Sequence, residues 1–204
     1  MRIAIFIILL GVLLSSKISF AQNPVKKNYY AKWVLTKGGS LKVAGSTNVN
    51  KFTCEISDYS SPDTITVYNP GAEQSLPVRG ILKLNIDAFD CHNPMMTSDL
   101  YKTLKGKQFP KMFIQFVSLN KFPEFTSPNN NVSGVVNIEL AGAIKSYVVN
   151  YAFYKDASGS VIRLIGRRRV NFGDFNLIPP RKLGGLIRTK EELDVEFNLL
   201  MRVL

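Results

Sequence analysis

Few residues in this sequence could carry chemistry: two cysteines, one histidine and a cluster of basic side chains. Cys54, Cys91 and the adjacent His92 could together contact a metal ion, but no fourth ligand is evident for the usual tetrahedral site. An even pair of cysteines in an exported chain more often forms one disulfide in an oxidising compartment. We therefore expect a Cys54–Cys91 bridge and no metal centre.

Support for enzymatic chemistry is thin. His92 is the single histidine, and it sits in a turn-like setting between Cys91 and Asn93-Pro94. The sequence has no G-x-S-x-G, H-E-x-x-H or C-x-x-C pattern, which would indicate a nucleophile, a zinc site or a redox pair. We expect His92 to be an exposed turn residue, and we expect no catalytic residue and no cofactor.

The basic residues are concentrated in one part of the chain. The formal net charge is +11, and the stretch 163–190 holds eight basic residues and one acid. Such a cluster suits nucleic acid, an anionic lipid surface or a phosphorylated ligand, and export argues against nucleic acid. The alternative is a solvated face that keeps the protein soluble.

The N-terminus has the pattern of an export signal. Arg2 precedes the apolar run Ile3–Leu14, and Ser19-Phe20-Ala21 offers the small residues that signal peptidase accepts. The run is shorter than the ~20 residues that span a bilayer. We expect residues 1–21 to be a signal peptide, residues 22–204 to be a single domain, and the protein to be periplasmic or secreted.

The dominant period in the remaining chain is two, which is typical of half-buried strands. Clear alternation marks Ile81–Phe89, Val132–Leu140, Ile144–Tyr154 and Leu193–Val203. Shorter candidates are Trp33–Thr36, Leu41–Ala44, Lys51–Ile56, Thr64–Tyr68, Met112–Leu119 and Ser160–Ile165. About eight to ten strands at this spacing predict an all-β, antiparallel sandwich or barrel.

Turn residues separate these strands, and one segment breaks the pattern. Lys37-Gly38-Gly39 predicts a turn, and Ala141-Gly142 is short enough for a hairpin. Ser98–Lys105 predicts a short helix, with Thr97 or Ser98 as its N-cap and Gly106 at its end. Thr47, Asn48 and Asn50 are expected to close a turn or bulge.

Several segments, in this order, resemble the YceI-like family. They are Gly45–Ile56 (GSTNVNKFTCEI), Asp90-Cys91, the helix after Met95-Met96, Gln108–Met112 before the strand Ile114–Phe116, and Asn171–Asn176 (NFGDFN). The resemblance spans residues 33–203. Asn176 stands where the family commonly has glycine.

The resemblance implies a lipocalin-like antiparallel barrel of about eight strands that holds a long isoprenoid or other apolar lipid. The candidate lining residues are Leu82, Leu84, Ile86, Phe116, Val136, Ile138, Leu140, Phe197, Leu199 and Met201. The same rows could instead form a solid core. A lipid diphosphate at the barrel mouth could be met by Arg167, Arg168, Arg169 and Arg181.

These observations predict a non-catalytic carrier of a long apolar lipid, such as an isoprenoid quinone or polyprenyl compound, in the bacterial envelope. The alternative is an envelope interaction protein with a filled barrel and a basic surface for a protein partner or an anionic membrane. An enzyme acting on lipid-like substrates is a third possibility. The sequence leaves the oligomeric state open.

Overall fold

The computed structural model describes residues 29–68, 75–125 and 132–204. The predicted signal peptide, residues 1–21, lies outside the described residues. The elements, in chain order, are β1 (Tyr29–Ser46), β2 (Lys51–Tyr59), β3 (Thr64–Tyr68), β4 (Leu76–Asn85), the 3₁₀ turn η1 (Ile86–Ala88), α1 (Pro94–Thr103), β5 (Lys111–Leu119), β6 (Val132–Leu140), β7 (Ala143–Lys155), β8 (Val161–Asn171), η2 (Phe172–Phe175), β9 (Arg181–Lys182), η3 (Leu183–Gly185), β10 (Ile187–Arg188) and β11 (Glu192–Val203).

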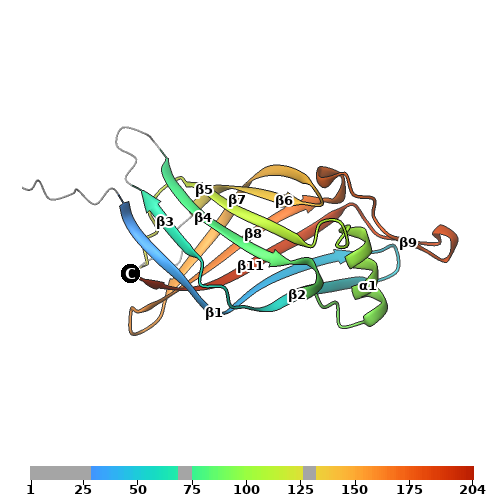
Figure 1. Ribbon diagram of the computed structural model, residues 1–204, viewed down its shortest axis with the longest axis horizontal. Helices are drawn as coiled ribbons and strands as arrows, with labels where there is room; N and C mark the ends of the chain where they lie inside the picture. The colour runs from blue at the N-terminus through green and yellow to red at the C-terminus, as the bar shows by residue number, and fades with distance from the viewer. Residues whose placement is uncertain (1–28, 69–74, 126–131) are drawn as a thin grey trace, which may run out of the picture.

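Eight antiparallel strands close into a barrel (Figure 1). Their order is β1, β3, β4, β5, β6, β7, β8 and β11, and β11 pairs back onto β1. The ninth strand of the sheet, β2, pairs with the second half of β1. The α1 helix and the β9–β10 hairpin lie at one end of the barrel, and the C-terminus lies at the other (Figure 1). The predicted all-β barrel with one short helix is confirmed.

The strand β1 is longer than its sequence suggests. Two short strands separated by a turn at Lys37-Gly38-Gly39 were expected, and this prediction is wrong because the chain runs on as one strand of 18 residues. Gly38 takes a φ of +94°, and the register with β11 shifts between Thr36 and Ser40. Such a bulge bends a strand without ending it. As a result, the first half of β1 pairs with β3 and the second half with β2.

The helix α1 begins earlier than predicted. Its N-cap is Asn93, whose side chain accepts a hydrogen bond from the backbone N–H of Met96, so the predicted caps Thr97 and Ser98 are wrong. Pro94 occupies the first helical position, where its missing N–H costs nothing. The left-handed residue after the helix is Lys105, with a φ of +55°, rather than Gly106.

Two other local predictions have different outcomes. The hairpin at Ala141-Gly142 is confirmed, and both residues have the positive φ that a tight primed turn requires, +52° and +82°. The strand predicted over Ile81–Phe89 instead covers Leu76–Asn85 and gives way to η1 at Ile86. The backbone N–H of Ile86 is bonded to the carbonyl of Pro110.

The barrel has a seam where β2 and β4 lie near one another with no ladder between them among the described strands. Tyr59 of β2 crosses this seam, because its hydroxyl accepts a hydrogen bond from the N–H of Lys83 at 3.2 Å and donates one to Asp63. Burial, followed by the bond to Asp63, raises the pKa of Tyr59 to about 12. The hydroxyl therefore stays protonated and the bridge is kept throughout the neutral range.

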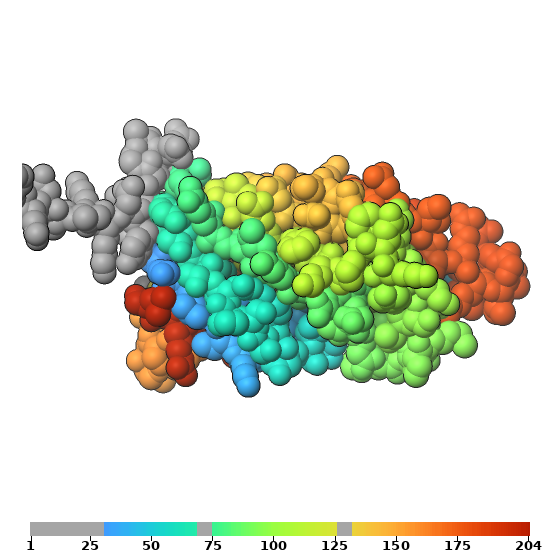
Figure 2. All heavy atoms as spheres, in the orientation of Figure 1, coloured from blue at the N-terminus to red at the C-terminus, as the bar shows by residue number. Residues whose placement is uncertain are grey.

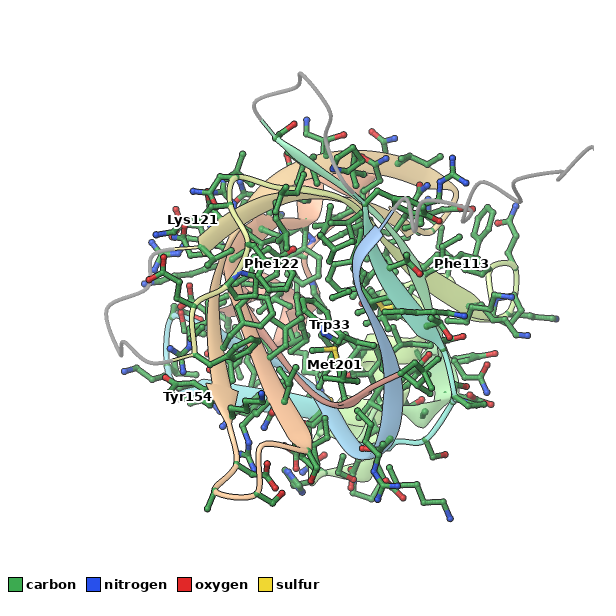
Figure 3. The ribbon with its side chains drawn as sticks, turned by 90° about the vertical axis from the view of Figure 1, so that its left-hand side faces the viewer. Trp33, Phe113, Lys121, Phe122, Tyr154 and Met201 are labelled. Carbon is green, nitrogen blue, oxygen red and sulfur yellow. A yellow bond between two sulfur atoms is a disulfide. The ribbon has the colours of Figure 1, made fainter. Side chains whose placement is uncertain are left out.

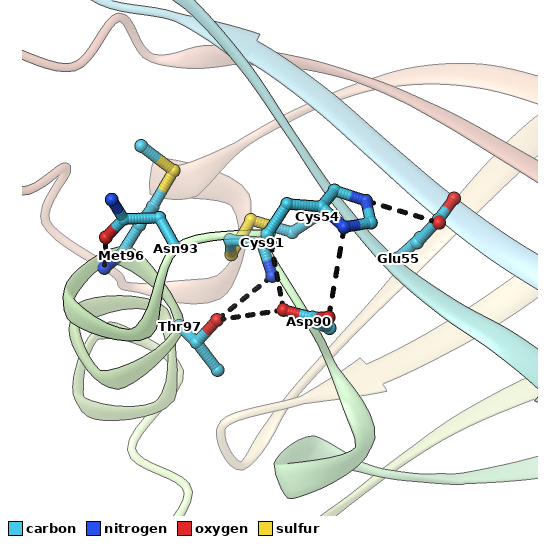
Figure 4. Close-up of a disulfide and its surroundings, with 8 residues drawn as sticks. Cys54, Glu55, Asp90, Cys91, Asn93, Met96 and Thr97 are labelled. Carbon is cyan, nitrogen blue, oxygen red and sulfur yellow. Dashed lines mark hydrogen bonds and ion pairs between the residues drawn. A yellow bond between two sulfur atoms is a disulfide. The ribbon is translucent and has the colours of Figure 1, made fainter.

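A disulfide closes the same seam near α1. Cys54 of β2 is bonded to Cys91, which confirms the predicted pairing (Figure 4). Next to it, Glu55 and Asp90 exchange two backbone hydrogen bonds of 2.8 and 2.9 Å. The N–H of Cys91 is bonded to the hydroxyl of Thr97 at 3.0 Å, which ties the bridge to the helix.

We predict that replacing both cysteines with alanine lowers the free energy of unfolding by about 3 to 4 kcal/mol. The reason is that the cross-link spans a sequence separation of 37 residues in the unfolded chain. Urea unfolding of the oxidised protein and of the double variant measures the difference. Equal stabilities would show that the backbone bonds alone hold the seam.

Candidate functional site

The side chains predicted to line the barrel do face its interior. Nine of the ten are buried, and Leu140 is half-buried. They come from β4, η1, β5, β6 and β11, and no charged side chain is buried with them among the described residues. Figure 3, which looks into the barrel from the end opposite α1, shows Trp33 and Met201 inside and Phe113 and Tyr154 outside.

Packed aromatic rings occupy the middle of the interior. The ring of Phe197 lies 5.9 Å from that of Phe116, edge to face, and 6.0 Å from that of Tyr151. Gly166 makes room for Phe197, because a Cβ at this glycine would stand 2.2 Å from the ring. We call Phe116, Tyr151, Phe153 and Phe197 the central aromatic cluster. Edge-to-face and tilted ring contacts of this kind stabilise a core by more than the burial of their apolar surface alone would give.

One polar atom lies inside this cluster. The Tyr151 hydroxyl is buried and has no hydrogen-bond partner. Burial raises the pKa of Tyr151 well above its ordinary value, so the group stays neutral. An unpartnered hydroxyl in a core is unusual and destabilises the folded state. The alternating pattern of β7 predicted that Tyr151 is buried, but it gave no indication that the hydroxyl lacks a partner.

An apolar pocket of about 200 Å³ opens at the α1 end of the barrel. Most of its apolar lining comes from β2, α1, η2 and β10, namely Phe52, Cys54, Met96, Leu100, Phe172 and Ile187, and Val49 and Pro180 from connecting segments add to it. Cys54 and Phe172 are themselves part of the buried core, with exposed fractions of 1% and 4%. The pocket therefore has the barrel core as its floor. The lining residues predicted from the sequence do not include these apolar walls, because the walls come from segments far apart in the chain.

The rim of the pocket is polar. Asp99 of α1 and Lys182 of β9 line it and form an ion pair of 2.5 Å. Thr47 and Asn50 also line it, and their side chains bond to each other at 2.6 Å across the turn between β1 and β2. The predicted role of Thr47, Asn48 and Asn50 in closing a turn is confirmed. Asn48 additionally bonds to the β9–β10 hairpin.

The NFGDFN motif closes the barrel beside this pocket. Phe172 and Phe175 are buried, and Asp174 caps η2 by accepting a hydrogen bond from the N–H of Asn171. The Asp174 carboxylate also accepts a 2.7 Å bond from the Tyr147 hydroxyl, which is the main reason that its pKa is lowered. Asn176 has a left-handed backbone, with a φ of +53°, which asparagine tolerates where the family commonly has glycine.

The arginines proposed for a head group do not converge on the pocket. Arg167 and Arg169 are exposed and pair with Glu196 and Asp194 of β11, at 2.6 and 2.9 Å. The hydrogen bond that Arg169 donates to Asp194 raises the pKa of the Arg169 guanidinium above its ordinary value.

The other two candidate arginines are also apart from each other. Arg168 lies 5.7 Å from the ring of Tyr147, whereas Arg181 lies on the β9–β10 hairpin. Of the basic residues in this stretch, it is Lys182 that reaches the pocket.

His92 lies on the surface beside the disulfide. It has a φ of +56°, and its ring lies 3.3 Å from a carboxylate oxygen of Glu55 (Figure 4). Across residues 29–68, 75–125 and 132–204, no three His, Cys, Asp or Glu side chains are grouped to hold a metal ion. In the same residues, no helix is both long and apolar enough to cross a membrane.

Comparison with solved structures shows the fold. A polyisoprenoid-binding domain from Saccharophagus degradans, implicated in plant cell wall breakdown, matches 86% of this chain and 100% of its own with a TM-score of 0.60 and 10% identity. BcnA of Burkholderia cenocepacia matches 79% of this chain and 95% of its own with a TM-score of 0.54 and 9% identity. The YceI protein of Campylobacter jejuni matches 69% of this chain and 81% of its own with 17% identity and a TM-score of 0.42.

No protein-family model and no curated protein matches the sequence. The first two structural matches carry the comparison, and they show that the chain shares its barrel fold with these two proteins. The resemblance that the sequence motifs indicated is therefore confirmed as a likeness of fold.

We predict opposite effects for two tyrosines of β7. Tyr151→Phe removes an unpartnered buried hydroxyl and raises the free energy of unfolding by about 1 kcal/mol. Tyr147→Phe, the matched control, breaks the bond to the Asp174 carboxylate and lowers it by about 1.5 kcal/mol or more. Thermal and urea unfolding measure both. A loss of stability in Tyr151→Phe would mean that its hydroxyl has a partner, such as a buried water.

We also predict that Asp174 makes stability depend on pH. Its lowered pKa means that its stabilising effect is fully present above the unfolded value of about 3.9 and is lost as the pH falls through the folded value. Asp174→Asn should therefore destabilise the protein by about 1 kcal/mol at pH 7, and by less in acid. Urea midpoints at neutral and acidic pH test this. A difference that does not shrink in acid would contradict it.

Proposed function

We propose that the protein binds a long apolar lipid of the isoprenoid type, with the tail entering through the pocket at the α1 end. The observation that carries this proposal is a pocket whose apolar walls continue into an uncharged barrel core. Each methylene removed from water contributes about 0.8 kcal/mol, so a polyprenyl tail can bind tightly without polar contacts.

The size of the pocket implies that binding rearranges the interior. A volume of about 200 Å³ is smaller than the ~300 to 1,000 Å³ typical of small-molecule sites, so it holds only part of a long tail. The rest of the tail would follow the inward rows, including Leu82, Leu84 and Ile86, and displace rings of the central aromatic cluster. Tight lipid binding and movement of Phe197 are then coupled.

The polar head would remain at the rim of the pocket. Lys182 is the cation placed there, and it is already paired with Asp99. An anionic head group can compete with Asp99 for this lysine, whereas Arg167 and Arg169 are engaged with acids on β11. Lys182 is therefore a better candidate for head-group contact than the Arg167–Arg169 run.

The comparison with the Saccharophagus degradans domain supports an isoprenoid ligand, because that protein is described as binding polyisoprenoids. The Cys54–Cys91 disulfide supports an oxidising compartment, in agreement with the predicted signal peptide at residues 1–21. We propose a periplasmic or secreted single domain, residues 22–204, that acts as a carrier without catalysis. His92, the single histidine, is exposed and is not among the residues that line the pocket.

The packed central aromatic cluster favours a second candidate, an envelope interaction protein whose barrel stays filled. Such a protein would purify without a lipid, and its aromatic rings would not move when isoprenoids are added. Lipid extraction of gently purified protein, followed by mass spectrometry, separates the two candidates.

We predict that Met96→Arg reduces co-purified lipid at least tenfold, because it places a charge in the wall of the pocket. Met95→Arg is the matched control, because Met95 is the neighbour of Met96 on α1 and its side chain is 67% exposed. It should leave lipid content unchanged. Native mass spectrometry of wild type and both variants provides the measurement.

Two outcomes would overturn the proposed function. If wild-type protein yields no apolar lipid and takes up none from detergent solution, the barrel is not a carrier. If Met96→Arg and Met95→Arg retain equal amounts of lipid, the pocket at the α1 end is not the route into the barrel.

A further inference from the structure

The β9–β10 hairpin displays two large apolar side chains at its tip. Leu183 and Leu186 are 70% and 76% exposed, and Ile178, which precedes the hairpin, is 80% exposed. The hairpin projects beyond α1 at the end of the molecule that carries the pocket (Figures 1 and 2). From these features we infer that the hairpin docks the barrel onto an anionic lipid bilayer, with Leu183 and Leu186 inserted at the boundary between head groups and acyl chains.

The local structure holds the two leucines outward. The side chain of Asn48 donates to the carbonyl of Leu186 and accepts from the N–H of Arg188, both at 2.9 Å. The Arg188 guanidinium donates to the carbonyl of Gly185 at 2.8 Å. The hairpin is therefore fixed to the turn between β1 and β2 from one side and braced from within.

The backbone at the tip is unusual for its sequence. Leu183, Gly184 and Gly185 all have positive φ, at +51°, +63° and +96°. Glycine adopts this region freely, but a leucine there is uncommon and costs free energy. In this conformation the Leu183 side chain is 70% exposed. Backbone outliers of this kind cluster at functional sites, which supports a functional role for the exposed tip.

The charges around the tip fit an anionic surface. Residues 177–190 include four basic residues and no acid. Lys182 is paired with Asp99, but Arg181, Arg188 and Lys190 are exposed. Apolar side chains flanked by arginine and lysine are the pattern of interfacial membrane anchors.

The position of the hairpin favours a bilayer over a protein partner. Pro180, Lys182, Ile187 and Thr189, which lie on or beside the two strands of the hairpin, also line the pocket. Docking by the tip brings the pocket opening to the bilayer surface, where apolar lipids reside. The tip is a narrow projection (Figure 1), which suits insertion between lipids more than the broad contact of a protein interface.

Vesicle flotation tests the inference with the full chain. The vesicles are phosphatidylcholine alone or phosphatidylcholine mixed with phosphatidylglycerol. Leu183→Ser/Leu186→Ser should weaken binding to the mixed vesicles at least about tenfold. Val203→Ser/Leu204→Ser is the matched control, because it removes two exposed aliphatic side chains at the opposite end of the barrel. Wild type and all variants are compared in the same form of the chain, so any contribution of residues 1–21 is equal in all of them.

Two further experiments measure the contribution of the basic side chains and the depth to which the tip of the hairpin inserts. Arg181→Gln/Lys190→Gln should weaken binding to the mixed vesicles about fivefold for each charge, and leave binding to neutral vesicles unchanged. A Leu186→Trp variant reports insertion directly, through a blue shift of its indole fluorescence on mixed vesicles and quenching by brominated lipids. The native Trp33 is 2% exposed and provides a constant background.

Equal loss of binding in the hairpin variant and in the control would overturn the inference. So would a Leu186→Trp variant whose fluorescence does not shift when mixed vesicles are added. Binding of the hairpin to an envelope protein in place of vesicles would overturn it as well. Lipid uptake from detergent solution is independent of docking. If wild-type protein binds vesicles but takes up no isoprenoid, the docking inference is supported and the carrier function is refuted. If it takes up isoprenoid but does not bind vesicles, the carrier function is supported and the docking inference is refuted.

Discussion

The structure depends on closing a sheet whose strands do not all reach their neighbours. The β1 strand bulges at Gly38 and divides its edge between β3 and β2, which leaves a seam between β2 and β4. Unpaired edges expose backbone donors and acceptors and invite aggregation. Here the Cys54–Cys91 bond, the backbone exchange between Glu55 and Asp90, and the Tyr59 hydroxyl seal the seam. These contacts close the seam beside the apolar interior.

The same seam shapes the candidate site. Because β2 is held by cross-links at its α1 end, Phe52 and Cys54 form one wall of a pocket instead of packing into a continuous barrel wall. The α1 helix supplies the facing wall through Met96 and Leu100. In the part of the chain that the structure describes, an apolar pocket opens at this end and packed aromatic rings fill the centre. Under the proposed function, a long guest would have to displace rings that already stabilise the empty protein.

The features that could be predicted from the sequence are those that depend on the alternation of apolar and polar residues, namely the strands and the side chains that face the interior. Strands such as Val132–Leu140 and Thr64–Tyr68 have the expected bounds, because one face of each is buried and every second side chain is apolar. Gly38-Gly39 was misread, because glycines permit a bulge and a turn equally. The inward rows were predictable for the same reason as the strands. The pocket was not, since its lining residues come from four separate elements and leave no periodic pattern in the sequence. The pairing of Arg167 and Arg169 with β11 depends on strand register, which alternation does not give.

Asn48 links two parts of the molecule that are 140 residues apart in sequence. One amide side chain bonds to both the carbonyl of Leu186 and the N–H of Arg188, while its own turn borders the pocket through Thr47 and Asn50. The two loops consequently form a single mechanical unit. If a lipid were to enter and push the first loop aside, these two bonds would carry the displacement to the hairpin, so the outermost tip of the protein would respond to the occupancy of the interior.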